Sequence, residues 1–261
     1  MRAFFCAGLA ATSQMLLAAP ASAQWQGDVG MSARSVIHTE VDRAGRRLVR
    51  ETGVLPGVVL NAAYRSGDTA WFAAADWHRH ALAYRGQNQA GMAAASTTST
   101  GLASVRLGAR QAYAGGYFAL AAFEIDRWDR RIAGTATSAG LQEHSRSRRL
   151  LAGAGKAWHP AAGTVCADAA LVLSEPERLQ VGFSGLLDPV TFKTRAAQGI
   201  RIGTSLRPAF APWLALRGGY DWIRVRRSGD APVSAHGQFV GTVAQPEHER
   251  QALTLTAAYV F

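Results

Sequence analysis

Five acidic and histidine side chains stand at spacings that suit proton-transfer chemistry. Asp76, His78 and His80 alternate along one segment, and Glu124 and Asp126 alternate along another. In an extended strand, side chains two residues apart point to the same side, so each set shares one face. A carboxylate beside a histidine can orient the ring as a general base for water or an ester. The pattern therefore raises the hypothesis of a catalytic cluster near an outer rim, although no serine nucleophile motif accompanies it.

The segments that carry these residues alternate apolar and polar positions, which is the period-2 pattern of β-strands with one apolar face. In the segment of Asp76, for example, Trp71, Ala73, Ala75 and Trp77 occupy the alternate positions. Ten such strands are expected along the chain, over residues 25–38, 58–65, 70–84, 101–111, 117–126, 148–158, 164–174, 192–207, 213–226 and 253–261.

The first 23 residues have the order of a secretory signal. Arg2 precedes apolar runs, and the small-residue triplet Ala21-Ser22-Ala23 follows Pro20. This arrangement predicts a signal peptide over residues 1–23 and an exported domain over residues 24–261. Beyond the signal, no stretch of about 18 strongly apolar residues predicts a transmembrane helix.

The ten expected strands are joined alternately by short turns and long loops. Aromatic residues occupy the turn ends, at Trp71, Tyr117, Trp158 and Trp213. Only helices and closed barrels satisfy every backbone group in lipid. We therefore predict an all-β fold, a single transmembrane antiparallel up-and-down β-barrel of about ten strands with short periplasmic turns and long extracellular loops. A soluble β-sandwich is the rival fold.

The C-terminal segment carries the closest resemblance to a known class. Phe261 and Tyr259 continue an apolar stripe through Ala257, Leu255 and Leu253. This ending resembles the last strand of Gram-negative outer-membrane β-barrels, in which a terminal Phe is read by the barrel-assembly machinery. The resemblance implies that Tyr259 and Phe261 form an assembly signal and that the protein resides in the cell outer membrane.

In size, strand count and loop lengths the chain also resembles the omptin proteases, in architecture only. Omptin catalysis relies on an Asp pair in the second long loop and an Asp-His pair in the fourth. Here the expected second loop, residues 85–100, has no acidic residue, and the fourth, residues 175–191, has Asp188 but no His. The resemblance therefore implies no protease activity.

Charged residues at inward positions favour a structural role for the interior. Ten strands enclose a lumen only a little wider than the side-chain-filled interior of eight-stranded barrels, which excludes a wide pore. Buried charges require partners of opposite sign. We expect the acidic candidates Asp76, Glu124 and Asp126 to join an ion-pair ladder, whose other members are Arg106, Arg110, Asp168, Arg195, Arg201 and Arg217.

The expected loops are rich in arginine, and the formal charge of the chain is +10. Such clusters suit phosphate and sulfate groups. The candidate binding residues are Arg46, Arg47, Arg50, Arg146, Arg148, Arg149, Arg224, Arg226 and Arg227. Outer-membrane lipid, lipopolysaccharide and an anionic glycan are the expected partners; alternatively these arginines only neutralise anionic headgroups. No nucleic-acid-binding motif accompanies the charge, so nucleic acid is not expected.

Together these features predict a non-enzymatic surface-binding or envelope-structural protein. A narrow selective channel and a hydrolase with a rim Asp/His/Glu site are the alternatives. Cys166 is the one cysteine beyond the signal, which leaves no disulfide within the chain and no paired-cysteine metal site. No cofactor and no metal are expected.

Overall fold

A computed structural model describes residues 24–87, 91–136 and 139–261. The predicted signal peptide lies outside these residues. Ten long antiparallel strands form the wall: β1 (Gln24–Val41), β2 (Arg47–Ser66), β3 (Thr69–Gln87), β4 (Ala93–Ala112), β5 (Tyr117–Ile132), β6 (Leu141–Trp158), β7 (Gly163–Ser174), β10 (Ala197–Pro208), β11 (Leu214–Val225) and β14 (Glu247–Val260).

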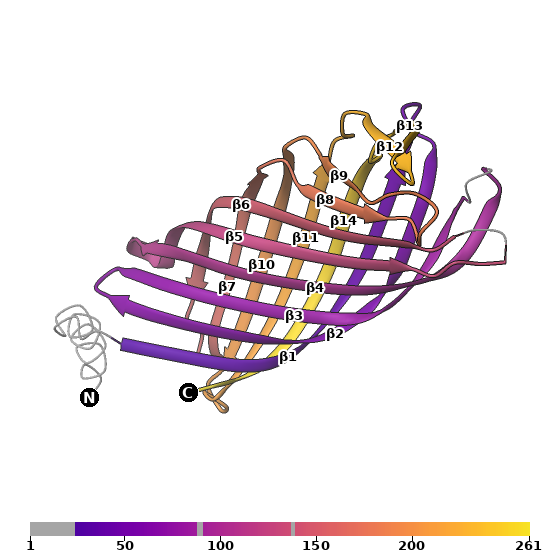
Figure 1. The fold of residues 1–261 in the computed structure, drawn as a ribbon. Coiled ribbons are helices and arrows are strands. Elements are labelled where there is room, and N and C mark those ends of the chain that lie inside the picture. The colour runs from indigo at the N-terminus through magenta and orange to yellow at the C-terminus, as the bar shows by residue number, and fades with distance from the viewer. Residues whose placement is uncertain (1–23, 88–90, 137–138) are drawn as a thin grey trace, which may run out of the picture.

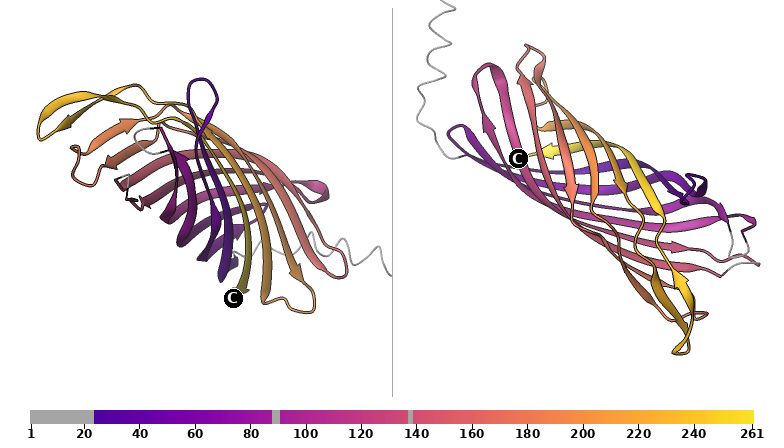
Figure 2. Two further views of the ribbon diagram at one scale, coloured as in Figure 1. Left: turned by 90° about the vertical axis from the view of Figure 1, so that its right-hand side faces the viewer. Right: turned by 90° about the horizontal axis from the view of Figure 1, so that it is seen from above.

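The wall closes into a barrel. Each of these strands pairs with the next along the chain, and β1 pairs with β14 from Asp28↔Val260 to Val41↔Glu247. The C-terminus lies at the end with the short turns (Figure 1). Two further views show the strands running obliquely around the barrel (Figure 2). The predicted ten-stranded up-and-down barrel is therefore confirmed, and the soluble sandwich is not what the chain forms.

Two small hairpins lie at the extracellular end of the barrel. Strands β8 (Arg178–Gly182) and β9 (Val190–Lys193) extend the edge of β6, whereas β12 (Ala231–Ala235) and β13 (Gln238–Val243) form a separate two-stranded sheet. At the opposite end the connections are tight. Gly67 has a φ of +60° in the turn between β2 and β3, a backbone conformation that favours glycine. A short 3-10 turn, η1 (Ala114–Gly116), joins β4 to β5.

Alternate residues of the wall face outward and are apolar. Met31, Leu107 and Leu171 are exposed, like most outward residues at their height. Exposed aromatic residues gather near the periplasmic turns, among them Trp25, Trp71, Tyr117, Trp158, Trp213 and Tyr259. Such an apolar band with an aromatic girdle is what a barrel presents to lipid. No helix among the described residues is long and apolar enough to cross a membrane.

Several strands are longer than predicted on the extracellular side. β2 begins at Arg47, β4 at Ala93 and β6 at Leu141, so the first three loops are shorter than expected. Arg47 and Arg50 are therefore strand residues rather than loop residues. The extracellular halves of these strands were not predicted, because a transmembrane strand needs only about ten residues to cross the lipid. Beyond the lipid a strand needs no apolar face, so the alternating pattern is lost there. The predicted eighth strand is also wrong at its start, because Phe192 belongs to β9.

Candidate functional site

The extracellular half of the lumen holds one arginine among three glutamates. Arg130 on β5 lies 2.5 Å from Glu143 and 3.1 Å from Glu40, and its Nε donates to Glu51 at 3.1 Å. Thr98 also donates to Glu51, at 2.6 Å. All these side chains are buried. A buried guanidinium needs such partners, because its desolvation is costly.

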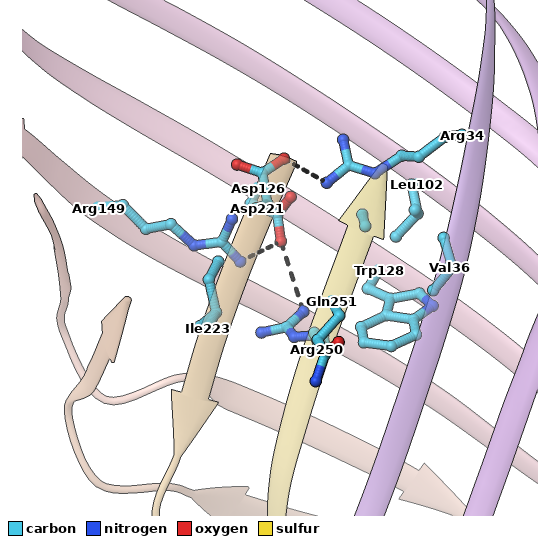
Figure 3. A pocket seen from close by; sticks show the side chains of 11 residues that line it. Arg34, Val36, Leu102, Asp126, Trp128, Arg149, Asp221, Ile223, Arg250 and Gln251 are labelled. Carbon is cyan, nitrogen blue, oxygen red and sulfur yellow. Dashed lines mark hydrogen bonds and ion pairs between the residues drawn. The ribbon is translucent and has the colours of Figure 1, made fainter. Parts of the chain in front are cut away.

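A second group of ion pairs lies beside the first. Arg149 contacts Glu124 at 3.1 Å and Asp126 at 2.7 Å. Arg201 contacts Glu124 at 2.6 Å and Asp221 at 2.5 Å. Arg34 pairs with Asp221, and Arg149 and Arg250 lie beside Asp126, in a pocket that Trp128 also lines (Figure 3). The cavity among them measures only about 30 Å³, room for a single water. We call these two groups of ion pairs the lumen plug.

Below the plug the lumen opens to solvent. The side chains of Arg130 and Arg149 are 5% and 3% exposed, whereas those of Arg106, Arg217 and Arg110 are 31%, 32% and 44% exposed. The lower lumen is thus a vestibule that opens toward the periplasm. It ends at the lumen plug, where Arg130 and Arg149 are buried.

The structure places most predicted lumen residues inside the barrel. Arg201 belongs to the plug, while three arginines line the vestibule: Arg217 pairs with Asp28, Arg110 lies 3.9 Å from Asp168, and Arg106 lies 4.0 Å from Glu124. Arg195 is the exception, and its prediction was wrong. It precedes β10, is exposed, and has no ion pair in the described part of the chain. The strand begins five residues later than expected, at Ala197, which leaves Arg195 on the loop.

The catalytic candidates do not gather at the rim. Glu124 and Asp126 are held by arginines of the lumen plug. Asp76 and His78 lie lower in the lumen, and His80 is exposed, without a hydrogen bond or ion pair among the described residues. The rim cluster was therefore wrong, because equal counts of residues along tilted strands do not bring side chains into contact.

Asp76 and His78 instead meet two serines that sequence reasoning missed. The hydroxyl of Ser32 on β1 lies 2.7 Å from Nε2 of His78. Nδ1 of His78 lies 3.2 Å from Asp76, although this pair lacks the geometry of a hydrogen bond. Ser104 on β4 donates to Asp76. Ser32, His78 and Asp76 thus lie in a row, with the histidine ring between the serine and the aspartate.

The outer surface carries a groove directly above the lipid-facing band. Its cavity of about 250 Å³ lies across β3, β4, β5 and β6. Ser99, Gly101 and Ala103 of β4 form a floor of small residues. A Cβ added to Gly101 would meet no atom within 4 Å, so this floor is open. The walls are formed by longer side chains of the neighbouring strands, namely Trp77, Arg79, Asp129, Arg131, Gln142 and His144.

Two arginines of this outer groove are free to bind an anion. Arg79 and Arg131 are exposed, and neither has an ion pair among the described residues. Asp129, by contrast, is already neutralised: it lies 2.8 Å from Arg127 and 2.7 Å from His144. The groove therefore presents a net positive charge.

The predicted binding arginines are divided between surface and interior. Arg146 and Arg148 point outward above the lipid-facing band, whereas Arg149 is buried in the lumen plug and cannot bind a surface ligand. That prediction was wrong because adjacent strand residues point to opposite faces. At the loops, Arg46 hydrogen-bonds with Asp42 and lowers the pKa of that carboxyl.

The remaining loop arginines lie near the last long connection. Arg224 contacts Glu247 at 2.5 Å, and Arg227 pairs with Asp230. Arg226 is exposed, without an ion pair in the part of the chain that the structure describes. On the wall, exposed arginines without an ion pair among the described residues include Arg50, Arg79, Arg85, Arg131 and Arg146.

Comparison with known proteins identifies the fold. No family model matches the chain, and no curated protein matches it. The outer membrane protease OmpT from Escherichia coli is similar in structure, with a TM-score of 0.55, 10% identity, and coverage of 91% of this chain and 96% of that one. The translocator domain of the autotransporter NalP from Neisseria meningitidis has a TM-score of 0.51, 14% identity, and coverage of 96% and 92%. At these identities the likeness concerns the fold alone. With its closed ten-stranded wall and apolar outer band, the chain has the fold of the outer-membrane β-barrel proteins, omptin-like in architecture.

Proposed function

We propose that this barrel is a surface-binding protein of the outer membrane that holds the phosphate groups of lipopolysaccharide on its outer wall. The observation that carries the proposal is the outer groove, in which Arg79 and Arg131 stand exposed and unpaired beside a floor of small residues. Arginine suits phosphate because its planar fork donates two parallel hydrogen bonds.

The position of the groove favours a lipid over a soluble ligand. In the register of β3, β4 and β5, Arg79 is level with Gly101 and Asp129. Two outward rows lower, Val105 is level with Ile125, and the next row holds Leu107 and Phe123. A phosphorylated saccharide in the groove would therefore have its acyl chains directly against exposed apolar side chains. Trp77 lies between the two zones, where amphipathic rings favour the membrane interface.

The lumen plug argues against the alternative of a narrow channel. Any ion that crosses the barrel must pass Glu124 and the two arginines, Arg149 and Arg201, that each contact it at hydrogen-bond distance. Opening this path would leave buried charges without partners, at a cost of several kcal/mol.

The proposal is tested by the binding of bisphosphorylated lipid A to the purified, folded barrel, followed by native mass spectrometry. The double variant Arg79→Gln/Arg131→Gln is expected to bind lipid A at least about tenfold more weakly, equivalent to about 1.4 kcal/mol. Lipid A from which the phosphates have been removed is expected to bind the unaltered protein as weakly as the variant binds the intact lipid.

Arg65→Gln is the matched control. Arg65 is also exposed and unpaired among the described residues, but it lies at the periplasmic end of β2. This variant should retain full affinity. Equal binding by the double variant and the unaltered protein, or equal binding of phosphorylated and dephosphorylated lipid, would refute the proposal.

A further inference from the structure

Ser32, His78 and Asp76 form a contact chain that neither the lumen plug nor the outer groove explains. The Ser32 hydroxyl lies 2.7 Å from Nε2 of His78, and Asp76 lies 3.2 Å from Nδ1 of the same ring. These are the roles of nucleophile, general base and orienting acid in serine hydrolases, which recur on unrelated folds and are recognised by geometry.

The barrel register brings these residues together across three strands. Ser32 on β1 is level with Gly57 on β2, and Gly57 is level with His78 on β3. A Cβ at position 57 would lie 2.4 Å from Cδ2 of His78. The ring therefore lies across β2 in the space that Gly57 leaves, and only in this way does it reach the serine two strands away. A larger residue in this row would separate the base from the nucleophile.

Unpartnered donors flank the chain of contacts. Nε of Arg34 and Nε of Arg106 are buried and have no hydrogen-bond partner in the described structure. Arg34 is the next lumen-facing residue after Ser32 on β1, and Arg106 is the next after Ser104 on β4. Preorganised N–H donors without a partner are what a developing oxyanion requires.

Access to this group is from the vestibule. The side chain of Asp76 is 26% exposed, while Ser32 and His78 are 7% and 1% exposed. Only a small molecule can therefore reach the serine. Arg217 is held by Asp28 in the vestibule, whereas Arg106 and Arg110 lie 4.0 and 3.9 Å from Glu124 and Asp168, beyond hydrogen-bond distance, so a small molecule with a negative charge is favoured beside these two arginines.

We propose that Ser32 and His78 hydrolyse small anionic carboxylic esters that enter the lumen from the periplasmic end, with Asp76 orienting the imidazole ring. This activity is independent of lipid binding in the outer groove.

The reaction requires only the ester and water. Oγ of Ser32 bonds to the acyl carbon while its proton passes to Nε2 of His78. The carbon–oxygen bond to the alcohol then breaks, and the alcohol leaves with that proton. A water molecule next attacks the acyl-serine and gives a proton to Nε2, which returns it to Ser32 as the carboxylic acid departs. One ester and one water become one alcohol and one acid.

A small fluorophosphonate probe tests the nucleophile in the folded full-length protein. We expect a covalent adduct on Ser32, located by peptide mass spectrometry, and hydrolysis of 4-nitrophenyl succinate faster than of neutral 4-nitrophenyl acetate. Ser32→Ala should abolish both. Ser205→Ala is the control, because Ser205 faces the vestibule on β10 and is more exposed than Ser32. It should change neither.

The variant Asp76→Asn tests whether Asp76 orients the His78 ring or only stabilises the fold. Loss of this charge should slow the labelling of Ser32, and Asp76→Glu, which keeps a carboxylate, should restore it in part, since a carboxylate stabilises the imidazolium that forms as Ser32 is deprotonated. Arg34 and Arg106 are the other charged side chains that act on Asp76, and they remain in the variant. A barrel whose heat-modifiable gel shift proves that it is folded, yet whose Ser32 stays unlabelled or is labelled no faster than Ser205, would overturn the proposal.

Discussion

Replacement of Arg149 by methionine tests whether the lumen plug stabilises the barrel. The guanidinium lies 3.1 Å from Glu124 and 2.7 Å from Asp126, and it is only 3% exposed. Removal of one partner of a buried pair costs about 3–5 kcal/mol, because the remaining charge is left uncompensated. Here each acid keeps another arginine: Arg201 lies 2.6 Å from Glu124, and Arg250 lies 3.7 Å from Asp126. We therefore expect a loss of about 3 kcal/mol, the low end of that range.

The adjacent residue supplies a matched control. Arg148 points outward, is 66% exposed and lies 3.8 Å from Glu175. An exposed pair of this kind contributes at most about 1 kcal/mol, so Arg148→Met should change stability by less than that. The assay is urea unfolding in lipid vesicles, followed by tryptophan fluorescence and by the heat-modifiable gel shift.

A suppressor variant completes the test. Arg149→Met combined with Asp126→Asn removes the one uncompensated negative charge as well, while Glu124 keeps Arg201, and should recover part of the lost stability. Equal unfolding midpoints for Arg148→Met and Arg149→Met, or a further loss in the combined variant, would refute the reasoning.

Three further predictions concern the lumen and the strand ends. The reconstituted barrel should give no current steps in a planar bilayer at neutral pH, because the lumen plug seals it; steady unitary steps would contradict the plug. Gly57→Ala should destabilise the barrel by about 1–3 kcal/mol in urea, since the added Cβ meets His78 and the Trp77 carbonyl at 2.4 Å; an unchanged midpoint would contradict this packing. Deletion of Phe261, whose backbone pairs with Gly27 at 2.9 and 3.0 Å, should lower the amount of folded protein in the outer membrane; fractionated membranes with undiminished folded protein would count against an assembly role.

The transmembrane wall was predictable from sequence because lipid imposes a strict alternation. Met31 and Leu107 were assigned outward from this pattern alone, and both are exposed in the structure. The turn around Gly67 was predictable as well, since its residue types favour tight turns. Above the membrane this constraint ends, so the sequence predicts a loop where the first half of β2 lies.

The candidate sites were less predictable because they depend on register across strands. The contact between Ser32 and His78 requires the pairing of β1 with β2 and of β2 with β3, and sequence alternation gives direction but not this alignment. Gly57 gave no such signal, because Pro56-Gly57 directly before the expected second strand is typical of a loop. The outer groove likewise depends on four neighbouring strands, and Gly101 is informative only once Arg79 and Asp129 are known to flank it.

The most direct test of the central claim is spin-label accessibility at three depths of the barrel. A label at Leu107 on the outer band should respond to oxygen, and a label at the native Cys166 in the vestibule should respond to a water-soluble nickel chelate. A label at Thr98 in the lumen plug should respond to neither. The labels at Leu107 and Thr98 are introduced in a Cys166→Ala background. We predict this pattern because Leu107 faces lipid, Cys166 faces the periplasmic vestibule and Thr98 lies among buried ion pairs. Free access of the nickel chelate to Leu107, or to Thr98, would contradict the lipid-facing wall or the sealed lumen.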